Sequence, residues 1–228
     1  MRLPRLLRCE QYIEDSALTV STAPRTIHDF GGFPPALHAY QYPAPGDPAL
    51  AARVQNLLAP LATRLDQEWG LDHGTWSVLA HVYPDADVPV VQLAIDRTQP
   101  AAFHYDLGRR LAPLRDEGVL IVGSGNVVHN LGVIQWGGKS APYPWASAFD
   151  SAFRENLEQR NHRPLIDYLE LGEAARMSIP TPDHYLPALY VLGAQRDGDA
   201  LSILTDGIEL GSISMLSFAF SPGQPAPV

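Results

Sequence analysis

Residues 119–130 read VLIVGSGNVVHN, and this stretch says most about the fold. Four apolar residues, 119–122, lie between Gly118 and Gly123 and predict a buried strand. In α/β proteins, ligands commonly bind where the chain leaves the carboxyl end of a strand. His129 closes the glycine turn, and an imidazole can bind a metal or move a proton near neutral pH. Spacing alone is equally consistent with a core histidine on a tight turn.

On either side of this stretch, helical and strand patterns alternate. Asp47 and Pro48 are typical of the first residues of a helix, and the leucines that follow recur at helical spacing. The alternation predicts one α/β layered domain over residues 1–228, with a central, mostly parallel or mixed sheet flanked by helices. The expected strands are 18–21, 88–95, 119–122, 201–204 and 212–220, and the expected helices are 48–61, 75–82, 100–115, 144–159, 164–171 and 182–192. Residues 28–47 are expected as loop and 71–74 as a turn, and the last two strands could form an antiparallel hairpin at the sheet edge.

Composition narrows the class of protein. The chain has 228 residues, is 46% hydrophobic, is 18% charged and carries a formal net charge of −9. This acidity argues against a nucleic-acid surface, which needs clustered Lys and Arg. The single cysteine, Cys9, excludes an internal disulfide framework. No apolar run reaches the ~18 residues of a membrane span, and residues 1–8 do not resemble a signal peptide, so a cytoplasmic protein is expected.

Histidines are the main candidates for chemistry. Four of the eight, His28, His73, His129 and His184, lie beside turn-forming or helix-starting residues. Such positions can converge at one edge of a sheet, as metal binding requires, although the spacing of these four is not a metal signature. Surface or packing roles are expected for the other four, which are His38, His81, His104 and His162.

Other common motifs are incomplete in this chain. The glycine loop has Val128 where a dinucleotide fingerprint has its third glycine, and it lacks the Lys-Ser/Thr pair of a P-loop. Ser124 is not in a nucleophile-elbow pattern. Trp136 and the aromatic residues of 143–145 could line a planar substrate, although ordinary packing explains them as well.

Five motifs, taken together and in order, resemble a known family. They are TIHDFGGFP at 26–34, LDHG at 71–74, GSGNVVHN at 123–130, PWA at 144–146 and PTPDHYLP at 180–187. The set resembles the class III extradiol ring-cleavage dioxygenases, in the 4,5-DOPA dioxygenase extradiol branch, from about Tyr12 onward.

The resemblance implies an α/β fold with a metal at the carboxyl edge of a central sheet. The implied cofactor is a non-haem divalent metal, Fe(II) for catalysis or Zn(II) as isolated. The implied partners are a small-molecule catechol such as DOPA and O2, with no nucleic acid and no membrane. His129 and His184 match metal-binding positions, with an acid/base role for His129 as the alternative, and His73 matches a histidine that moves a catechol proton.

The chain departs from the family at its start. Family members carry two further metal histidines there, in His-Gly-Ser-Pro and Ser-Ala-His-Trp motifs, and this sequence has neither. Counting back from His28, the second motif falls on residues 8–11, with Glu10 in place of histidine. The basic run 1–8 replaces the strand that should precede it, so we expect the centre of the sheet to lose a strand and expose apolar faces.

Three explanations of this departure remain open. The chain is a shortened version of an active enzyme, or a relative that keeps an aromatic-ligand pocket without a metal and has no activity, or a protein in which Glu10 completes a new site. Two histidines and one carboxylate are the common facial arrangement for oxygen-activating iron. A zinc hydrolase on the same scaffold is a further alternative, which oxygen consumption on adding a catechol would separate from a dioxygenase.

The Glu10 hypothesis makes a direct prediction. If the carboxylate is a ligand, the Glu10→Ala variant loses iron binding, because two imidazoles alone leave the facial set incomplete. Metal content measured after reconstitution with Fe(II) tests this, and unchanged binding would refute the hypothesis.

Overall fold

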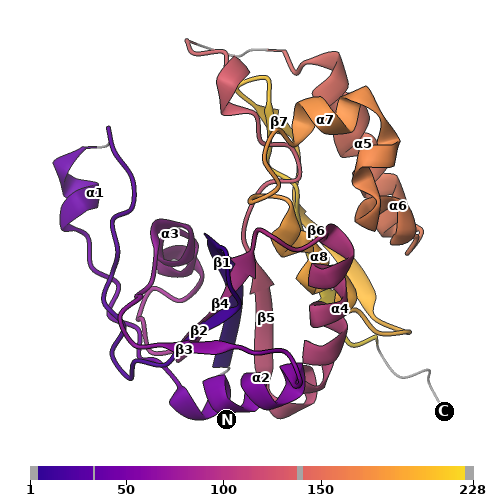
Figure 1. Cartoon of the computed structure of the whole chain (residues 1–228). Helices are drawn as coiled ribbons and strands as arrows, with labels where there is room; N and C mark the ends of the chain where they lie inside the picture. The colour runs from indigo at the N-terminus through magenta and orange to yellow at the C-terminus, as the bar shows by residue number, and fades with distance from the viewer. Residues whose placement is uncertain (1–4, 33, 138–140, 224–228) are drawn as a thin grey trace. The chain divides into compact units, whose positions relative to one another are not determined.

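The computed structural model describes residues 5–32, 34–137 and 141–223, with the backbone alone over 8–13 (Figure 1). The chain forms two compact units. Unit 1 consists of Met1–Pro100 and Arg110–Ser124, and unit 2 consists of Ala101–Arg109 and Gly125–Val228. The single domain over 1–228 stays a prediction. No helix in the described ranges is long and apolar enough to cross a membrane.

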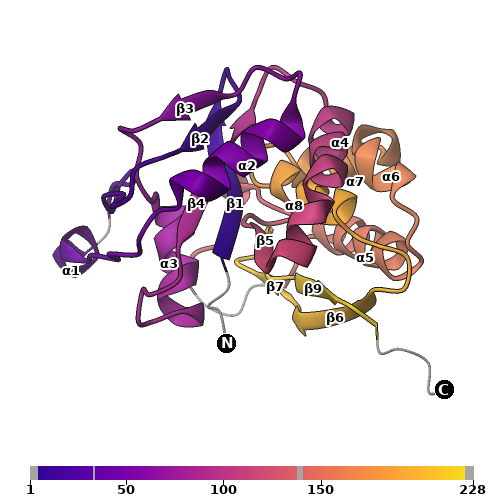
Figure 2. The same cartoon turned by 90° about the horizontal axis from the view of Figure 1, so that it is seen from below.

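Unit 1 is built on a five-stranded sheet with the order β3-β2-β4-β1-β5, and α2 and α3 pack against its strands (Figure 2). The expected α/β fold with a mixed sheet is therefore confirmed: β1 is parallel to β4 and β5, whereas β2 is antiparallel to β4. The elements are β1 (Arg5–Ile13), β2 (Ala17–Thr19), α1 (Pro35–Ala39), α2 (Pro48–Leu58), β3 (Arg64–Asp66), α3 (His73–Val82), β4 (Val90–Asp96), η1 (Ala112–Glu117) and β5 (Val119–Gly123).

The lost central strand was a wrong expectation. Part of the basic N-terminal run lies in β1, which pairs with β4 on one side and β5 on the other. Leu6 and Leu7 are both fully buried although successive strand residues point to opposite faces, so β1 is covered on both faces. The basic residues of the run therefore do not prevent the strand from pairing on both sides.

Of four further expectations for unit 1, one is confirmed and three are corrected. The Asp47 carboxylate accepts from the Leu50 N–H at 2.9 Å, which confirms the predicted start of α2. The predicted loop 28–47 contains α1, which buries no residue. The predicted turn 71–74 includes the first residues of α3, and the predicted buried strand β5 is an edge strand that buries only Val119 fully.

Unit 2 is mainly helical, with α5 packed against α6 and α7 and with two small antiparallel sheets. The predicted hairpin partners form their own antiparallel sheet, β6 with β9, and do not extend the large sheet; β7 and β8 lie between them in the chain. The elements are α4 (Ala101–Leu111), η2 (Leu131–Val133), α5 (Pro144–Glu158), α6 (Arg163–Ile166), η3 (Tyr168–Leu171), α7 (Glu173–Ser178), α8 (Leu186–Gly193), β6 (Ala200–Thr205), β7 (Ile208–Glu209), β8 (Ile213–Ser214) and β9 (Ser217–Ser221); the last two residues of α4 belong to unit 1.

In unit 1, the segment before α1 runs beside the segment before α3. Thr26 and Leu71 form a parallel bridge, and the Leu71 N–H donates to the Arg25 carbonyl at 2.8 Å. A Cβ at Gly70 would lie 1.9 Å from the Arg25 carbonyl oxygen. Only glycine therefore lets the two segments approach this closely.

We expect Gly70→Ala to lower the free energy of unfolding by about 1–3 kcal/mol or more, because the added methyl forces the two segments apart. Urea unfolding measures the change. Gly31→Ala is the matched control, since a Cβ there meets nothing within 4 Å. Equal stability of the two variants would contradict the close packing at Gly70.

Candidate functional site

The loop that follows β5 is tied to its surroundings by its main chain. The buried Val127 and Val128 anchor it, the Ser214 N–H donates to the Val128 carbonyl at 2.9 Å, and the His129 N–H donates to the Ser178 carbonyl at 2.9 Å. A bridge between His129 and Ile213 continues this pairing. The position of His129 is thus fixed on both sides by backbone hydrogen bonds.

Polar side chains of the same loop complete the attachment. The Asn126 amide donates to the Ser214 carbonyl and the Asn130 amide donates to the Met177 carbonyl, both at 2.7 Å. The Ser212 hydroxyl donates to the Asn130 carbonyl at 2.8 Å. Asparagines on both sides of His129 therefore hold segments that are distant in sequence.

His184 lies in the turn that leads into α8. The sequence placed it in the first turn of a helix over 182–192, but α8 begins at Leu186. The Tyr185 and Leu186 N–H groups both donate to the Pro182 carbonyl at 2.9 Å, which forms the turn. Tyr185 is fully buried, and its hydroxyl donates to the Leu165 carbonyl at 2.7 Å. This buried neighbour anchors His184 at the surface of unit 2.

His129 and His184 are brought together within unit 2. Their rings stack with centroids 3.6 Å apart and an interplanar angle of 22°. Burial, and secondly the neighbouring charge of His184, lower the pKa of His129 to about 4, although Asp183 opposes this shift. His129 is therefore neutral at pH 7, which is the form of imidazole that binds a metal.

The chemistry of this pair fits a non-haem metal, because imidazole nitrogen is a common ligand for iron and zinc. If both rings bind a metal, the pair would supply two ligands. Within the ranges 5–32, 34–137 and 141–223, no group of three or more His, Cys, Asp or Glu side chains could hold a metal ion. The Glu10 side chain lies outside the described residues, so the Glu10 hypothesis stays a prediction; its backbone follows Cys9, the register partner of Gly123 at the carboxyl end of β5.

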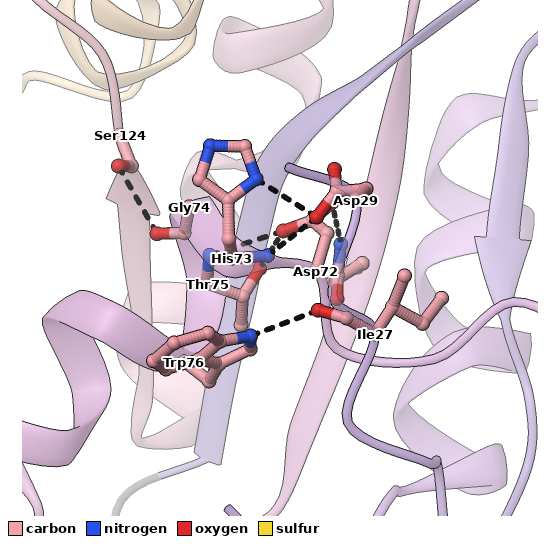
Figure 3. A network of polar contacts seen from close by, with 9 residues as sticks. Ile27, Asp29, Asp72, His73, Gly74, Thr75, Trp76 and Ser124 are labelled. Carbon is pink, nitrogen blue, oxygen red and sulfur yellow. Dashed lines mark hydrogen bonds and ion pairs between the residues drawn. The ribbon is translucent and has the colours of Figure 1, made fainter. Parts of the chain in front are cut away.

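His73, the third predicted site residue, lies in unit 1 as the first residue of α3 (Figure 3). The buried Asp72 caps the helix by accepting from the Thr75 N–H at 3.0 Å, and it also accepts from the Gln92 amide of β4 at 2.9 Å. The start of α3 is therefore fixed to the sheet. The His73 side chain is 47% exposed, and its Nδ1 lies 2.8 Å from Asp29 Oδ1.

Asp29 is the residue that the sequence analysis missed. It is 44 residues from His73, and its carboxylate also accepts from the His73 main-chain N–H at 3.0 Å. No local spacing signals such a pair. Only the bridge between Thr26 and Leu71, a few residues earlier in each segment, brings the two together.

The remaining histidines have other surroundings. His104 is fully buried with Nδ1 2.9 Å from the Tyr190 hydroxyl, and His162 is 2.9 Å from the Tyr105 hydroxyl, so both pack inside unit 2 as expected. His28 donates from Nε2 to the Tyr40 carbonyl at 2.8 Å. Tyr143 and Trp145 stack on each other with centroids 5.3 Å apart, whereas Trp136 is 81% exposed; a substrate-lining role for these aromatics stays a prediction.

Comparison with known families identifies the class of protein. Residues 10–220 match the family described as "Catalytic LigB subunit of aromatic ring-opening dioxygenase". The chain belongs to this family, whose extradiol members are oxidoreductases that cleave a catechol ring.

Individual relatives agree with the family. The chain is 51% identical to "4,5-DOPA dioxygenase extradiol" of Escherichia coli (strain K12), over 95% of this chain and 83% of the relative. It is 38% identical to "4,5-DOPA dioxygenase extradiol" of Beta vulgaris, over 86% of this chain and 74% of the relative. The crystal structure of an uncharacterized protein from Escherichia coli K12 superposes with a TM-score of 0.82 at 45% identity, covering 96% of this chain and 86% of that one. The resemblance and the α/β fold inferred from sequence are confirmed.

The glycine loop offers a test of how the histidine pair is held. A Cβ at Gly125 would lie 2.2 Å from the His184 carbonyl oxygen, so we expect Gly125→Ala to separate the two segments and to destabilise the protein by about 1–3 kcal/mol. Urea unfolding and the imidazole NMR signals of His129 and His184 measure both effects. Gly132→Ala is the control, because its Cβ would meet only the Asn130 side chain, at 3.3 Å. Unperturbed signals in Gly125→Ala would contradict the prediction.

Proposed function

We propose that this chain cleaves the ring of a catechol such as DOPA next to its two hydroxyls, with O2, at a non-haem divalent metal held by His129 and His184. The stacked His129–His184 pair is the observation that carries the proposal. Membership of the ring-opening dioxygenase family supports the reaction class, and the names of the relatives support the catechol.

The pair is suited to hold a cation. His129 is neutral because of burial, so a metal does not have to displace a proton from it at pH 7. The backbone hydrogen bonds around His129 and the turn before α8 fix the main chain of both histidines before any ligand arrives. A bound dication would lower the pKa of a catechol hydroxyl and orient the two hydroxyl oxygens. We propose Fe(II) as the catalytic metal and Zn(II) as the metal most often retained on isolation.

We assign His73 the role of taking up the proton that a catechol hydroxyl releases. A half-exposed imidazole can exchange protons with both a substrate and solvent near neutral pH. The role of His129 as an acid/base, with His184 as ligand, is the alternative within the same proposal. The catechol and O2 are the proposed partners.

The test is metal content together with oxygen uptake. Protein reconstituted with Fe(II) is expected to consume O2 on addition of DOPA and to form a ring-opened product. His129→Ala and His184→Ala are each expected to lose bound iron and at least about 100-fold in kcat, because each removes a proposed ligand. His81→Ala, at an exposed position of α3, is the matched control and is expected to keep both.

The outcomes separate the rival explanations. Iron binding and DOPA-dependent oxygen uptake in the unmodified chain, lost in both variants, support the proposal. A chain that binds catechols without metal and consumes no O2 would instead be the non-catalytic binding protein. Iron content equal in the unmodified chain and both variants would exclude His129 and His184 as ligands.

A further inference from the structure

We infer that Asp29 is a positioning residue that holds His73 with its proton on Nδ1 and leaves Nε2 as the proton-accepting atom. This inference deepens the proposed function and rests on it for the role of His73 in the reaction. It concerns two side chains of unit 1 whose contact is seen directly in Figure 3.

The contact between Asp29 and His73 requires a particular protonation of the imidazole. A carboxylate at neutral pH has acceptor atoms only, so the 2.8 Å contact between Asp29 Oδ1 and His73 Nδ1 requires a proton on Nδ1. In a neutral imidazole the other nitrogen then carries a lone pair. Nε2 points away from Asp29 in Figure 3. The pair thus determines which nitrogen of His73 can accept a proton.

The Asp29 carboxylate is held in a fixed position. Its Oδ1 accepts from both the main-chain N–H and the ring of His73, so one oxygen orients the helix start and the imidazole together. The first N–H groups of a helix lack partners within the helix and favour a negative charge. Asp29 is therefore held at the start of α3 independently of any substrate.

Neighbouring residues support the Asp29–His73 pair. Three contacts fix the Asp29 segment beside α3: the Thr26–Leu71 bridge, the close approach at Gly70, and the hydrogen bond from Trp76 Nε1 to the Ile27 carbonyl at 2.9 Å. The Phe30 ring meets the His73 ring edge to face, with centroids 5.6 Å apart and an interplanar angle of 80°. The imidazole is thus restrained by Asp29 at one nitrogen and by Phe30 through a ring contact.

This arrangement gives the two residues separate tasks. His73 would accept the catechol proton at Nε2, and Asp29 would stabilise the imidazolium that results. The proton moves from a catechol hydroxyl oxygen to His73 Nε2, with no redox change at either residue. Asp29 acts only through His73, so it positions the acid/base group and does not touch the substrate.

The experiment compares Asp29→Ala and Asp29→Asn with the unmodified chain. An alanine removes the acceptor, whereas an asparagine keeps an acceptor for the His73 main-chain N–H but can also donate to an unprotonated Nδ1. Both variants should therefore release the choice of tautomer, and Asn should do so without loss of the helix-start contact. Asp15→Asn is the matched control, because Asp15 pairs with Arg64 at a half-exposed position of the same unit.

The first measurement is independent of activity. Nitrogen-15 NMR of the imidazoles at alkaline pH, with His73 assigned by His73→Gln, reports which nitrogen carries the proton. We expect Nδ1–H in the unmodified chain and in Asp15→Asn, and a shift toward Nε2–H in both Asp29 variants. An Nε2–H tautomer in the unmodified chain, or no change in Asp29→Ala, would overturn the inference.

The second measurement is steady-state kinetics with DOPA and the Fe(II)-loaded protein. We expect Asp29→Ala to lower kcat by about tenfold or more, which is part of the roughly 10²–10⁴-fold that general acid–base catalysis contributes, with KM nearly unchanged. Adding Asp29→Ala to His73→Ala should cost nothing further, because the two act as one unit. A kcat in Asp29→Ala equal to that of Asp15→Asn would overturn the positioning role. If the unmodified chain turns over no catechol, the proposed function fails and the NMR result alone decides the inference.

Discussion

At Gly125 and at Gly70 the main chain runs so close to a second segment that a Cβ would lie 2.2 Å and 1.9 Å, respectively, from a carbonyl oxygen. Each glycine lies within four residues of a histidine for which we propose a role in the reaction. Gly125 allows the loop of His129 to meet the main chain of His184, and Gly70 allows the segment of Asp29 to meet the start of α3. Every other residue has a Cβ, so any substitution at these two positions would push the paired segments apart.

The surroundings of His129 and His73 differ in burial and in the partner that each ring contacts. In unit 2, burial and a second imidazole favour the neutral form of His129, as a metal ligand requires. In unit 1, the Asp29 carboxylate lies 2.8 Å from the half-exposed His73, which is compatible with the acid/base role that we propose for it. The two proposed roles of histidine thus go with two different surroundings of the same side chain.

In the N-terminal strand β1, the requirements of the fold are independent of the requirements of the chemistry. A central strand requires main-chain partners on both sides and apolar side chains on both faces, and β1 meets both conditions through β4, β5, Leu6 and Leu7. Neither condition depends on which side chain stands at position 10. The formation of this strand therefore says nothing of the chemistry, because fold is set by packing and function by particular side chains.

The sequence by itself determined the α/β class, the helix that begins after Asp47 and the family, because periodicity, capping residues and ordered motifs are local properties of the chain. It also singled out His73, His129 and His184, whose roles as site residues remain proposals. Tertiary structure alone decided that β1 lies inside the sheet between β4 and β5, that His129 stacks on His184 and that Asp29 meets His73. Each of these depends on which distant segments pair through their main chains, and a one-residue change of register would separate them. Such pairing is decided by the whole packed unit, so no local pattern in the sequence could have predicted it.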